Sequence, residues 1–248
     1  MRLITFSFLK CAREKIVKCG RRCLLCVNVF TKRPLRKHAG DRWEFVADTA
    51  SADTSSWQTK LQVRERVLAN VLVSAEFVSA EEERSLMDEM DIYLKKMRYE
   101  FDHWDNAIHG YRESERAQWL PGNWPVVSRL HAAALAHAAS GAQTLEYLHV
   151  LDLHQDGYIK PHVDSIRFCG DVIVGLCLLS AAVMRLSLVE QPALHADVLL
   201  PPRTLYVLKG DARYLCTHAV LGGAESVWQG RPVQRQRRVS VMCRTKPQ

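Results

Sequence analysis

The chain has 248 residues, of which 48% are hydrophobic, and a formal net charge of +7. This length can bury one good core, and no apolar run approaches the roughly 18 residues of a membrane span, so the composition excludes a protein that crosses a membrane by helices. The charge is uneven, because residues 1–40 carry eleven lysines and arginines against one acid, Glu14, a local charge of +10 that leaves −3 for the rest. A slightly acidic body argues against a large nucleic-acid surface on the folded part.

Residues 1–40 have the composition of a mitochondrial transit peptide, rich in arginine and lysine and poor in acids. They predict import into the mitochondrial matrix; the alternative is a basic arm that binds nucleic acid. Residues 41–65 include the polar run "ADTASADTSS" and predict a linker. The remaining residues, 66–248, are expected to form the functional domain.

The eight cysteines fall into two groups of four. In the leader, Cys19, Cys23 and Cys26 have the spacing that radical-SAM enzymes use for an iron–sulfur cluster. Positive residues surround them and no repeated strand–helix pattern follows, so no cluster is expected there. No secretory signal is evident, so the body cysteines are expected to be buried thiols rather than a disulfide framework. They are Cys169, Cys177, Cys216 and Cys243.

Two helices are expected early in the domain. Ser79 and Glu82 form a capping-box pattern, and apolar residues at helical spacing follow it, which predicts a helix of about 18–20 residues with one buried face. A second helix is predicted over 124–140, with Pro125 in its first turn and Gly141 after its end. The apolar positions of the first helix are Leu86, Met87, Met90, Tyr93, Leu94 and Met97.

Residues 99–115, between the helices, are aromatic and charged without a clean period. Their side chains could line a functional site, or they could belong to a structural hairpin with satisfied polar groups. The residues concerned are His103, Trp104, His109 and Tyr111.

After Gly141 the sequence changes to short strands separated by turn signals such as Cys169-Gly170 and Gly222-Gly223. Because no helical pattern separates the strands, they predict a sandwich or barrel rather than βαβ units. We therefore expect a mostly β (α+β) fold, a double-stranded β-helix or jelly roll with N-terminal supporting helices. The eight predicted strands are 144–153, 158–164, 172–179, 183–189, 197–200, 204–209, 214–220 and 237–243.

Two His-x-Asp pairs lie close together in "LHQDGYIKPHVDS". On a strand, residues i and i+2 point to the same side, so either pair could offer an imidazole and a carboxylate to one metal ion. His154 and Asp156 run into the Asp156-Gly157 hairpin signal, so they are expected in a solvated turn. His162 and Asp164 are expected within the second strand, which favours this pair as the site.

The expected hairpin also sets a register. A four-residue loop would pair Leu151 with Lys160 and His149 with His162, and His149 and Leu151 would then flank the metal side.

A metal site also needs a third ligand, and iron(II) oxygenases use two histidines and one carboxylate on one face of the metal. After residue 165 the only histidines are His195, in a loop-like stretch, and His218, inside a predicted strand. The stronger set is therefore His162, Asp164 and His218.

The last predicted strand, "RRVSVMCR", alternates between two faces. Val239, Val241 and Cys243 share the core face, while the opposite face carries an arginine at each end, Arg238 and Arg244. A buried arginine binds a carboxylate bidentately, and a dicarboxylate such as 2-oxoglutarate would fit between the metal and Arg238. The alternative is a strand at a barrel mouth with solvated arginines, which the preceding "RPVQRQRR" makes credible for Arg235 and Arg237 and less so for Arg244. The opposite face consists of Arg238, Ser240, Met242 and Arg244.

Four segments, "YEFDHWDNAIHGYRESE", "GYIKPHVDS", "RTLYVLKGDARYLCTH" and "RRVSVMCR", together resemble the AlkB family of iron(II)/2-oxoglutarate dioxygenases, and most closely its mitochondrial subfamily. The resemblance covers about residues 66–245. It implies that His162, Asp164 and His218 hold Fe(II) and that Arg238 anchors the far carboxylate of 2-oxoglutarate. It also implies that Tyr206, Ser240 and Arg244 contact the co-substrate.

The resemblance also bears on the substrate. Members that repair nucleic acids carry a polar Asn-x-Tyr element where this chain reads Leu151-Asp152-Leu153, and the mitochondrial subfamily is understood to lack the nucleotide-recognition lid. A protein or small-molecule substrate is implied, with a role in mitochondrial fatty acid metabolism and programmed necrotic cell death. The alternatives are an RNA demethylase, or a non-catalytic mitochondrial scaffold that binds partners through residues 99–120.

Overall fold

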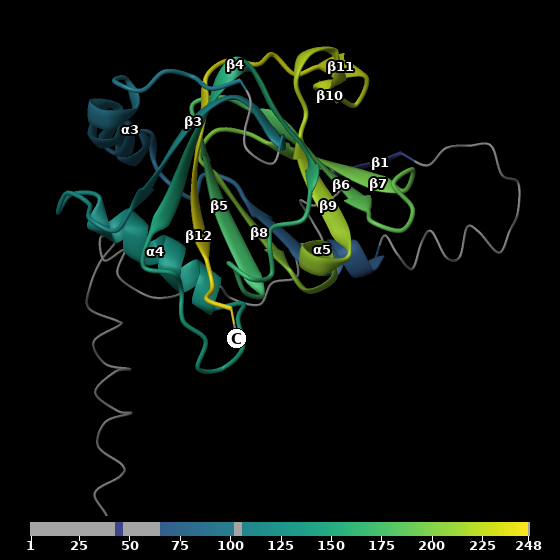
Figure 1. Cartoon of the computed structure of the whole chain (residues 1–248), viewed down its shortest axis with the longest axis horizontal. Helices are drawn as coiled ribbons and strands as arrows, with labels where there is room; N and C mark the ends of the chain where they lie inside the picture. Colours follow the sequence, from purple (N-terminus) through teal and green to yellow (C-terminus); the bar gives the residue numbers. More distant parts are fainter. Residues whose placement is uncertain (1–42, 47–64, 102–105, 248) are drawn as a thin grey trace, which may run out of the picture. The chain divides into compact units, whose positions relative to one another are not determined.

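The computed structural model describes residues 43–46, 65–101 and 106–247 (Figure 1). The predicted leader and most of the predicted linker lie outside the described residues. One short strand, β1 (Trp43–Val46), falls within the expected linker and pairs with a strand of the domain.

Ten strands form one antiparallel sheet in the order β1-β7-β6-β9-β4-β12-β5-β8-β2, and β3 pairs with β4 outside this path. A separate pair, β10 with β11, forms a small hairpin (Figure 1). The bounds after β1 are β2 (Val71–Ser74), β3 (Ile108–Arg116), β4 (Leu148–His162), β5 (Val172–Leu178), β6 (Ala182–Leu188), β7 (His195–Leu200), β8 (Thr204–Lys209), β9 (Cys216–Val220), β10 (Val227–Trp228), β11 (Arg231–Pro232) and β12 (Arg238–Arg244).

The sheet turns over on itself because β4 belongs to both of its halves. The first part of β4 pairs with β12, with Val150 opposite Val241, and its end pairs with β9, with His162 opposite His218. The two halves enclose an interior lined by alternate residues of each strand. This is the jelly roll that the sequence predicts, and the mostly β fold class is confirmed.

The strand β5 shows how the layers are built. Its sequence "VIVGLCL" is buried on both faces, as expected for a strand with packed layers on either side. Val172, Val174 and Leu176 pack toward the helices, whereas Ile173 and Cys177 pack into the interior of the jelly roll.

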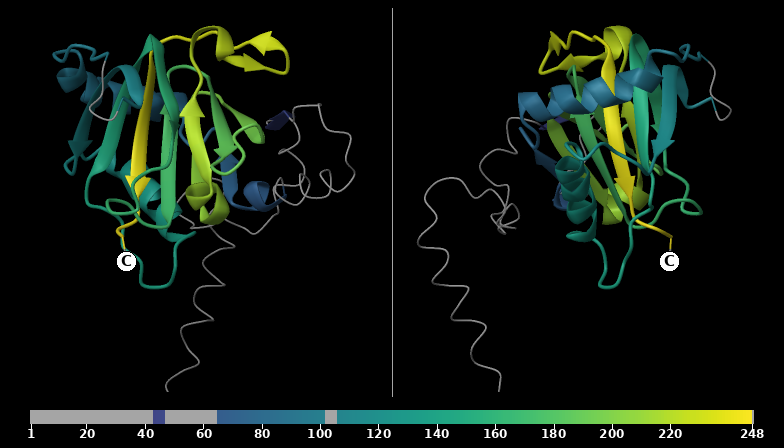
Figure 2. Two further views of the ribbon diagram at one scale, coloured as in Figure 1. Left: turned by 45° about the vertical axis from the view of Figure 1, so that its right-hand side comes forward. Right: turned by 90° about the vertical axis from the view of Figure 1, so that its left-hand side faces the viewer.

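The two predicted helices, α3 (Ala80–Leu94) and α4 (Trp124–Leu135), cover the outer face of the sheet (Figure 2). The capping box is confirmed, with Glu82 N–H donating to Ser79 Oγ at 3.1 Å and Ser79 N–H donating to Glu82 Oε2 at 2.9 Å. Both helices end earlier than predicted. Among the described residues, no helix is long and apolar enough to cross a membrane.

The buried stripe of α3 is narrower than predicted. Tyr93 and Met97, which the spacing assigned to it, are partly exposed. Met97 lies beyond the last helical residue, so it no longer follows the helical period. The positions that do pack against the sheet are Leu86, Met87, Met90 and Leu94.

The predicted hairpin at Asp156-Gly157 is wrong, because the chain continues through it as the single strand β4. His109 pairs with Tyr158, and the next pair along the two strands is Tyr111 with Leu153. Between these two pairs β3 has one unpaired residue, whereas β4 has four. The segment 154–157 is therefore a bulge in β4 rather than a reversal. The expected pairing of His149 with His162 fails with it, since His149 pairs with Glu115 and Met242.

Gly157 is required by a close contact between two strands, and not by a turn. A Cβ on Gly157 would lie 2.6 Å from the carbonyl oxygen of Gly110 and 3.0 Å from that of His154. Gly110 itself has a φ of +65° and marks the irregularity in β3. The two glycines let β3 and β4 approach each other closely at the bulge.

The remaining strands agree with prediction to within a few residues. Five of the described strands were not predicted, β1, β2, β3, β10 and β11, and β3 covers the second half of the ambiguous segment 99–115. The short helix α5 (Gly210–Tyr214) occupies the start of the predicted strand 214–220. His195, assigned to a loop, is the first residue of β7.

Replacing Gly157 with alanine is expected to destabilise the fold by about 1–3 kcal/mol, because the added methyl group would overlap backbone atoms that cannot rotate away. Gly122→Ala is the matched control, since a Cβ there meets nothing within 4 Å. Urea unfolding of both variants tests this, and equal stabilities would contradict it.

Candidate metal and co-substrate site

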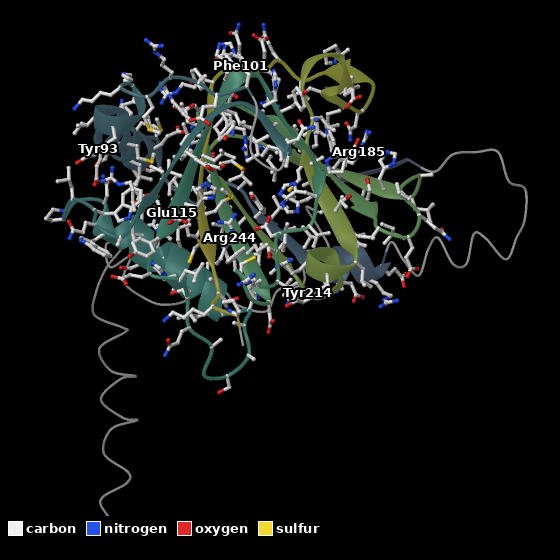
Figure 3. All side chains as sticks on the ribbon, viewed as in Figure 1. Tyr93, Phe101, Glu115, Arg185, Tyr214 and Arg244 are labelled. Atoms are coloured by element: carbon white, nitrogen blue, oxygen red, sulfur yellow. The ribbon has the colours of Figure 1, made fainter. Side chains whose placement is uncertain are left out.

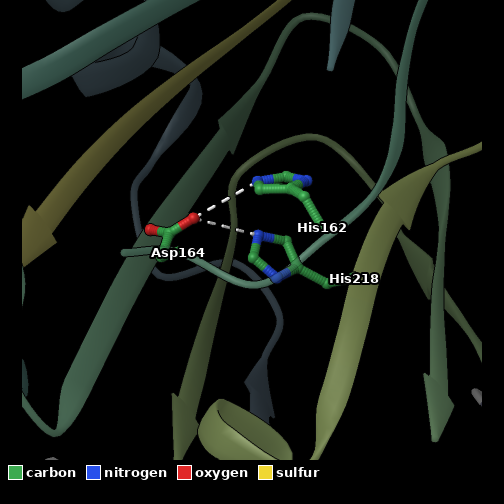
Figure 4. A group of neighbouring side chains, drawn as sticks. All are labelled: His162, Asp164 and His218. Carbon is green, nitrogen blue, oxygen red and sulfur yellow. Dashed lines mark ion pairs between the residues drawn. The ribbon is translucent and has the colours of Figure 1, made fainter. Parts of the chain in front are cut away.

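Three donor atoms converge at the end of β4. His162 is the last residue of β4, Asp164 follows two residues later, and His218 lies on β9 directly opposite His162. Asp164 Oδ1 is 3.2 Å from His162 Nε2 and 3.6 Å from His218 Nε2, and both rings point toward this oxygen (Figure 4). The structure therefore brings the predicted triad together. In the part of the chain that the structure describes, no other group of three metal-ligating side chains gathers in this way.

A hydrogen bond to the backbone orients the ring of His162. His162 Nδ1 lies 3.0 Å from the backbone carbonyl of Lys160. A carbonyl only accepts, so Nδ1 carries a proton, and Nε2 is the nitrogen that faces Asp164 and would coordinate a metal. This arrangement, in which one ring nitrogen donates to a carbonyl and the other faces the ligand set, is typical of metal-binding histidines.

The charges of the triad also suit a divalent cation. Burial, followed by the neighbouring His162, lowers the pKa of His218 to about 3, so its ring is neutral at physiological pH. Burial tends to raise the pKa of Asp164, but the hydrogen bond from His162 and the charge of Arg244 outweigh it and hold the pKa far below its usual range. The site thus offers two imidazoles and one carboxylate, the donor set that non-haem Fe(II) oxygenases use.

The other candidate histidines are not part of this group. His154 Nδ1 lies 3.3 Å from Asp156 Oδ2 on the bulge of β4, with side chains 38% and 80% exposed. The expectation that this pair is solvated is confirmed, although it lies in a bulge and not in a turn. His195 begins β7 and is also separate from the triad.

A cavity adjoins the triad inside the jelly roll. All four residues predicted to contact the co-substrate line it, namely Tyr206, Arg238, Ser240 and Arg244. They come from β8 and β12, and the alternation predicted for β12 is confirmed, because Val239, Val241 and Cys243 pack into the core on the other face. The remaining lining residues are Ile108, His149, Leu151, Ile159, His162, Asp164, Met184, His218, Val220 and Met242.

Arg238 is the unusual group in this cavity. It is only 1% exposed, and its Nη2 donates to Cys177 Sγ at 3.0 Å. Its Nε has no hydrogen-bond partner, and no carboxylate pairs with it, among the described residues. A buried guanidinium without an anion is costly, so the cavity suits a ligand that brings a carboxylate.

Tyr206 stands opposite Gly175 in the β5–β8 register. A Cβ at position 175 would overlap the Tyr206 ring, so glycine makes room for it inside the jelly roll. Burial raises the pKa of the Tyr206 phenol, which keeps its hydroxyl protonated as a hydrogen-bond donor toward the cavity.

Asp152 lies on the opposite face of β4 from the cavity-lining Leu151. It is fully buried and accepts hydrogen bonds from Arg112 Nε at 2.7 Å and Arg237 Nη2 at 2.8 Å, with Tyr99 Oη at 3.1 Å. The sequence did not indicate this network, because its members are far apart along the chain.

The alternative that Arg235 and Arg237 are solvated is wrong. Arg237 also pairs with Asp91 of α3 at 2.6 Å, and Arg235 donates to the backbone carbonyls of Leu221 and Gly157. Both arginines therefore fix the segment that leads into β12 and its cavity-lining residues.

Within 99–115, the described aromatic residues fit the structural alternative. His109 stacks on Tyr158 with ring centroids 5.0 Å apart, and the buried Tyr111 donates its hydroxyl to Glu100 at 3.2 Å. Neither lines the cavity, although Ile108 of the same strand does. His103 and Trp104 lie outside the described residues.

Two further groups support the site. His149 lines the cavity, as expected, although the pairing that predicted it is wrong. Arg213 of α5, which the sequence did not single out, is buried and donates to Cys169 Sγ at 3.0 Å and to the carbonyl of Gly170 at 3.2 Å. It thereby holds the loop that follows Asp164.

Comparison with known proteins gives close relatives. No protein-family model matches the chain. It is 45% identical over 186 residues to the Bos taurus protein named alpha-ketoglutarate-dependent dioxygenase alkB homolog 7, mitochondrial, which covers 75% of this chain and 83% of that protein. The Mus musculus protein of the same name is 44% identical over 183 residues, covering 74% and 81%.

Solved structures resemble the chain in fold alone. A Pseudomonas putida prolyl-4-hydroxylase aligns with a TM-score of 0.52 at 15% identity, over 72% of this chain and 93% of that one. A Trichoplax adhaerens prolyl hydroxylase, solved with a peptide of hypoxia inducible factor, aligns with a TM-score of 0.51 at 12% identity, over 79% and 94%.

The two His-x-Asp pairs give a direct test of the site. His162→Ala is expected to weaken Fe(II) binding by more than about 100-fold. Loss of a hydrogen-bond partner of a metal ligand typically lowers metal affinity about 10–100-fold, and loss of the ligand itself should lower it further. His154→Ala should bind Fe(II) as the unaltered protein does, because its side chain lies on the exposed bulge. Anaerobic Fe(II) titration measures both, and similar affinities for the two variants would contradict the assignment.

Proposed function

The chain belongs to the alkB homolog 7 group of the AlkB family of alpha-ketoglutarate-dependent dioxygenases, and we propose that His162, Asp164 and His218 hold the Fe(II) of this mitochondrial enzyme. The observation that supports the proposal most is the convergence of two imidazoles and one carboxylate on a single point, beside a buried arginine that no carboxylate of the described residues pairs with. Three ligands on one face leave the opposite positions open for co-substrate and oxygen.

We assign the co-substrate to the cavity between the triad and Arg238. Fe(II), when bound, supplies the oxygen chemistry in which 2-oxoglutarate is decarboxylated to succinate and a substrate C–H bond is hydroxylated. Arg238 would hold the far carboxylate with its planar fork, while Tyr206 and Ser240 add hydroxyl donors. Arg244 keeps Asp164 ionised through its 2.9 Å hydrogen bond to Oδ2.

The apolar part of the cavity bears on the substrate. Leu151 lines the cavity where nucleic-acid-repairing relatives carry a polar residue, and its neighbour Asp152 faces the other side of the sheet. Aliphatic walls exclude water but offer no hydrogen bonds to the edge of a base. We therefore propose a protein or small-molecule substrate of the mitochondrial matrix, with the role in fatty acid metabolism and programmed necrotic cell death that the resemblance implies. The other aliphatic lining residues are Ile108, Ile159, Met184, Val220 and Met242.

Arg238→Met is expected to weaken 2-oxoglutarate binding by about 10–150-fold, because hydrogen bonds to a charged group contribute about 1.5–3 kcal/mol. Arg231→Met is the matched control, because Arg231 is an exposed arginine on β11, away from the cavity. Calorimetric titration of 2-oxoglutarate into the Mn(II)-loaded proteins measures the binding, and succinate formation with Fe(II) measures turnover. Unchanged binding in Arg238→Met would refute the assignment of the anchor.

The substrate class can be read from mitochondria that contain either the unaltered protein or Arg238→Met. We expect a peptide or metabolite that carries one additional oxygen atom only when the unaltered protein is present. A difference confined to methylated bases of mitochondrial RNA would instead identify the enzyme as a nucleic-acid demethylase. No difference in any of these classes would favour the non-catalytic scaffold.

A further inference from the structure

Arg244, which is labelled in Figure 3, connects the proposed metal triad to a second pair of polar side chains. Its Nε donates to Asp164 Oδ2 at 2.9 Å, and its Nη1 lies 3.2 Å from His149 Nδ1. His149 Nε2 lies in turn 2.8 Å from Glu113 Oε2. These side chains form a continuous row from β3 through β4 and β12 to Asp164, across three strands that are neighbours in the sheet.

The guanidinium sets the direction of each hydrogen bond in this row, because it has donors and no acceptor. Arg244 Nη1 therefore donates to His149 Nδ1, which must carry a lone pair. The proton of the neutral ring is then on Nε2, which donates to the Glu113 carboxylate. Glu113 thus favours the one tautomer of His149 that can accept from Arg244.

We propose that Glu113 and His149 are positioning residues of the metal site that act through Arg244. An arginine side chain has many rotamers, and holding it at Nη1 keeps its Nε on Asp164 Oδ2. With that oxygen occupied, Asp164 directs Oδ1 to the point that the two histidines face, at 3.2 and 3.6 Å. This inference rests on the proposed function, because it takes Asp164 to be a metal ligand.

The competing explanation is a cross-strand pair that contributes only to the stability of the sheet. Two observations favour the positioning role. His149 lines the cavity rather than the outer face, and it contacts Arg244, which itself faces Asp164. In addition, the imidazole reaches diagonally to Glu113, although Glu115 lies directly opposite it in the β3–β4 register. Glu115 therefore serves as a matched control on the same strand.

The test is anaerobic titration of the full chain with Fe(II) alone. His149→Leu removes the acceptor for Arg244 and is expected to weaken Fe(II) binding by about 10–100-fold. His149→Asn returns an oxygen near the position of Nδ1 and should recover most of this loss. Glu113→Gln, which keeps an acceptor but removes the charge, should lose less than His149→Leu, and Glu115→Gln should bind as the unaltered protein does.

Unaltered Fe(II) affinity in His149→Leu would overturn the proposal, even if its unfolding temperature fell, because a structural pair would give that result. Equal losses in His149→Leu and His149→Asn would overturn it too. Should His149→Leu fail to fold, the affinity of Glu113→Gln decides, and no loss there counts against the proposal. Failure of the proposed function is distinguishable, since it would appear as unaltered Fe(II) binding in His162→Ala.

Discussion

The strand β4 is the constraint on which the site depends, because among the described strands it joins the half of the jelly roll that contains β12 to the half that contains β9. Its first part lies beside β12 and so beside Arg238 and Arg244. Its last residue, His162, lies opposite His218 on β9. A continuous strand therefore fixes the separation between the proposed co-substrate anchor and the proposed metal ligands. The bulge at 154–157 absorbs four residues without breaking that continuity.

The charges inside the jelly roll are unequally paired. Asp164 is satisfied twice, by Arg244 on Oδ2 and by the histidines on the side of Oδ1. Arg238 has only a thiol as its partner among the described residues. The interior thus keeps an excess positive charge in an apolar setting, where a ligand carboxylate gains far more than in water. A dicarboxylate would supply the negative charge that Arg238 lacks, and its other end would bind the metal at the triad.

The parts of the site that the sequence predicts are those carried by local alternation. Arg238 and Arg244 share a face of β12 as the period of a strand predicts, and the strand pattern also predicts the jelly roll. Asp164 was predicted to lie within the same strand as His162, but β4 ends at His162 and Asp164 lies just beyond it. The bulge is not predictable in the same way. The dipeptide Asp156-Gly157 suits a tight turn, but a glycine is needed equally where one strand passes close to the backbone of its neighbour. Contacts between distant segments, such as Asp152 with Arg112, have no local signature at all.

The central claim is that one cavity holds the metal at the triad and the far carboxylate of 2-oxoglutarate on Arg238. A crystal structure of the protein with Mn(II) in place of Fe(II) and with 2-oxoglutarate tests it most directly, because anomalous scattering locates the metal independently. The account predicts the metal between His162, Asp164 and His218, with one carboxylate of 2-oxoglutarate on the Arg238 guanidinium. Metal bound elsewhere, or 2-oxoglutarate without a contact to Arg238, would contradict it.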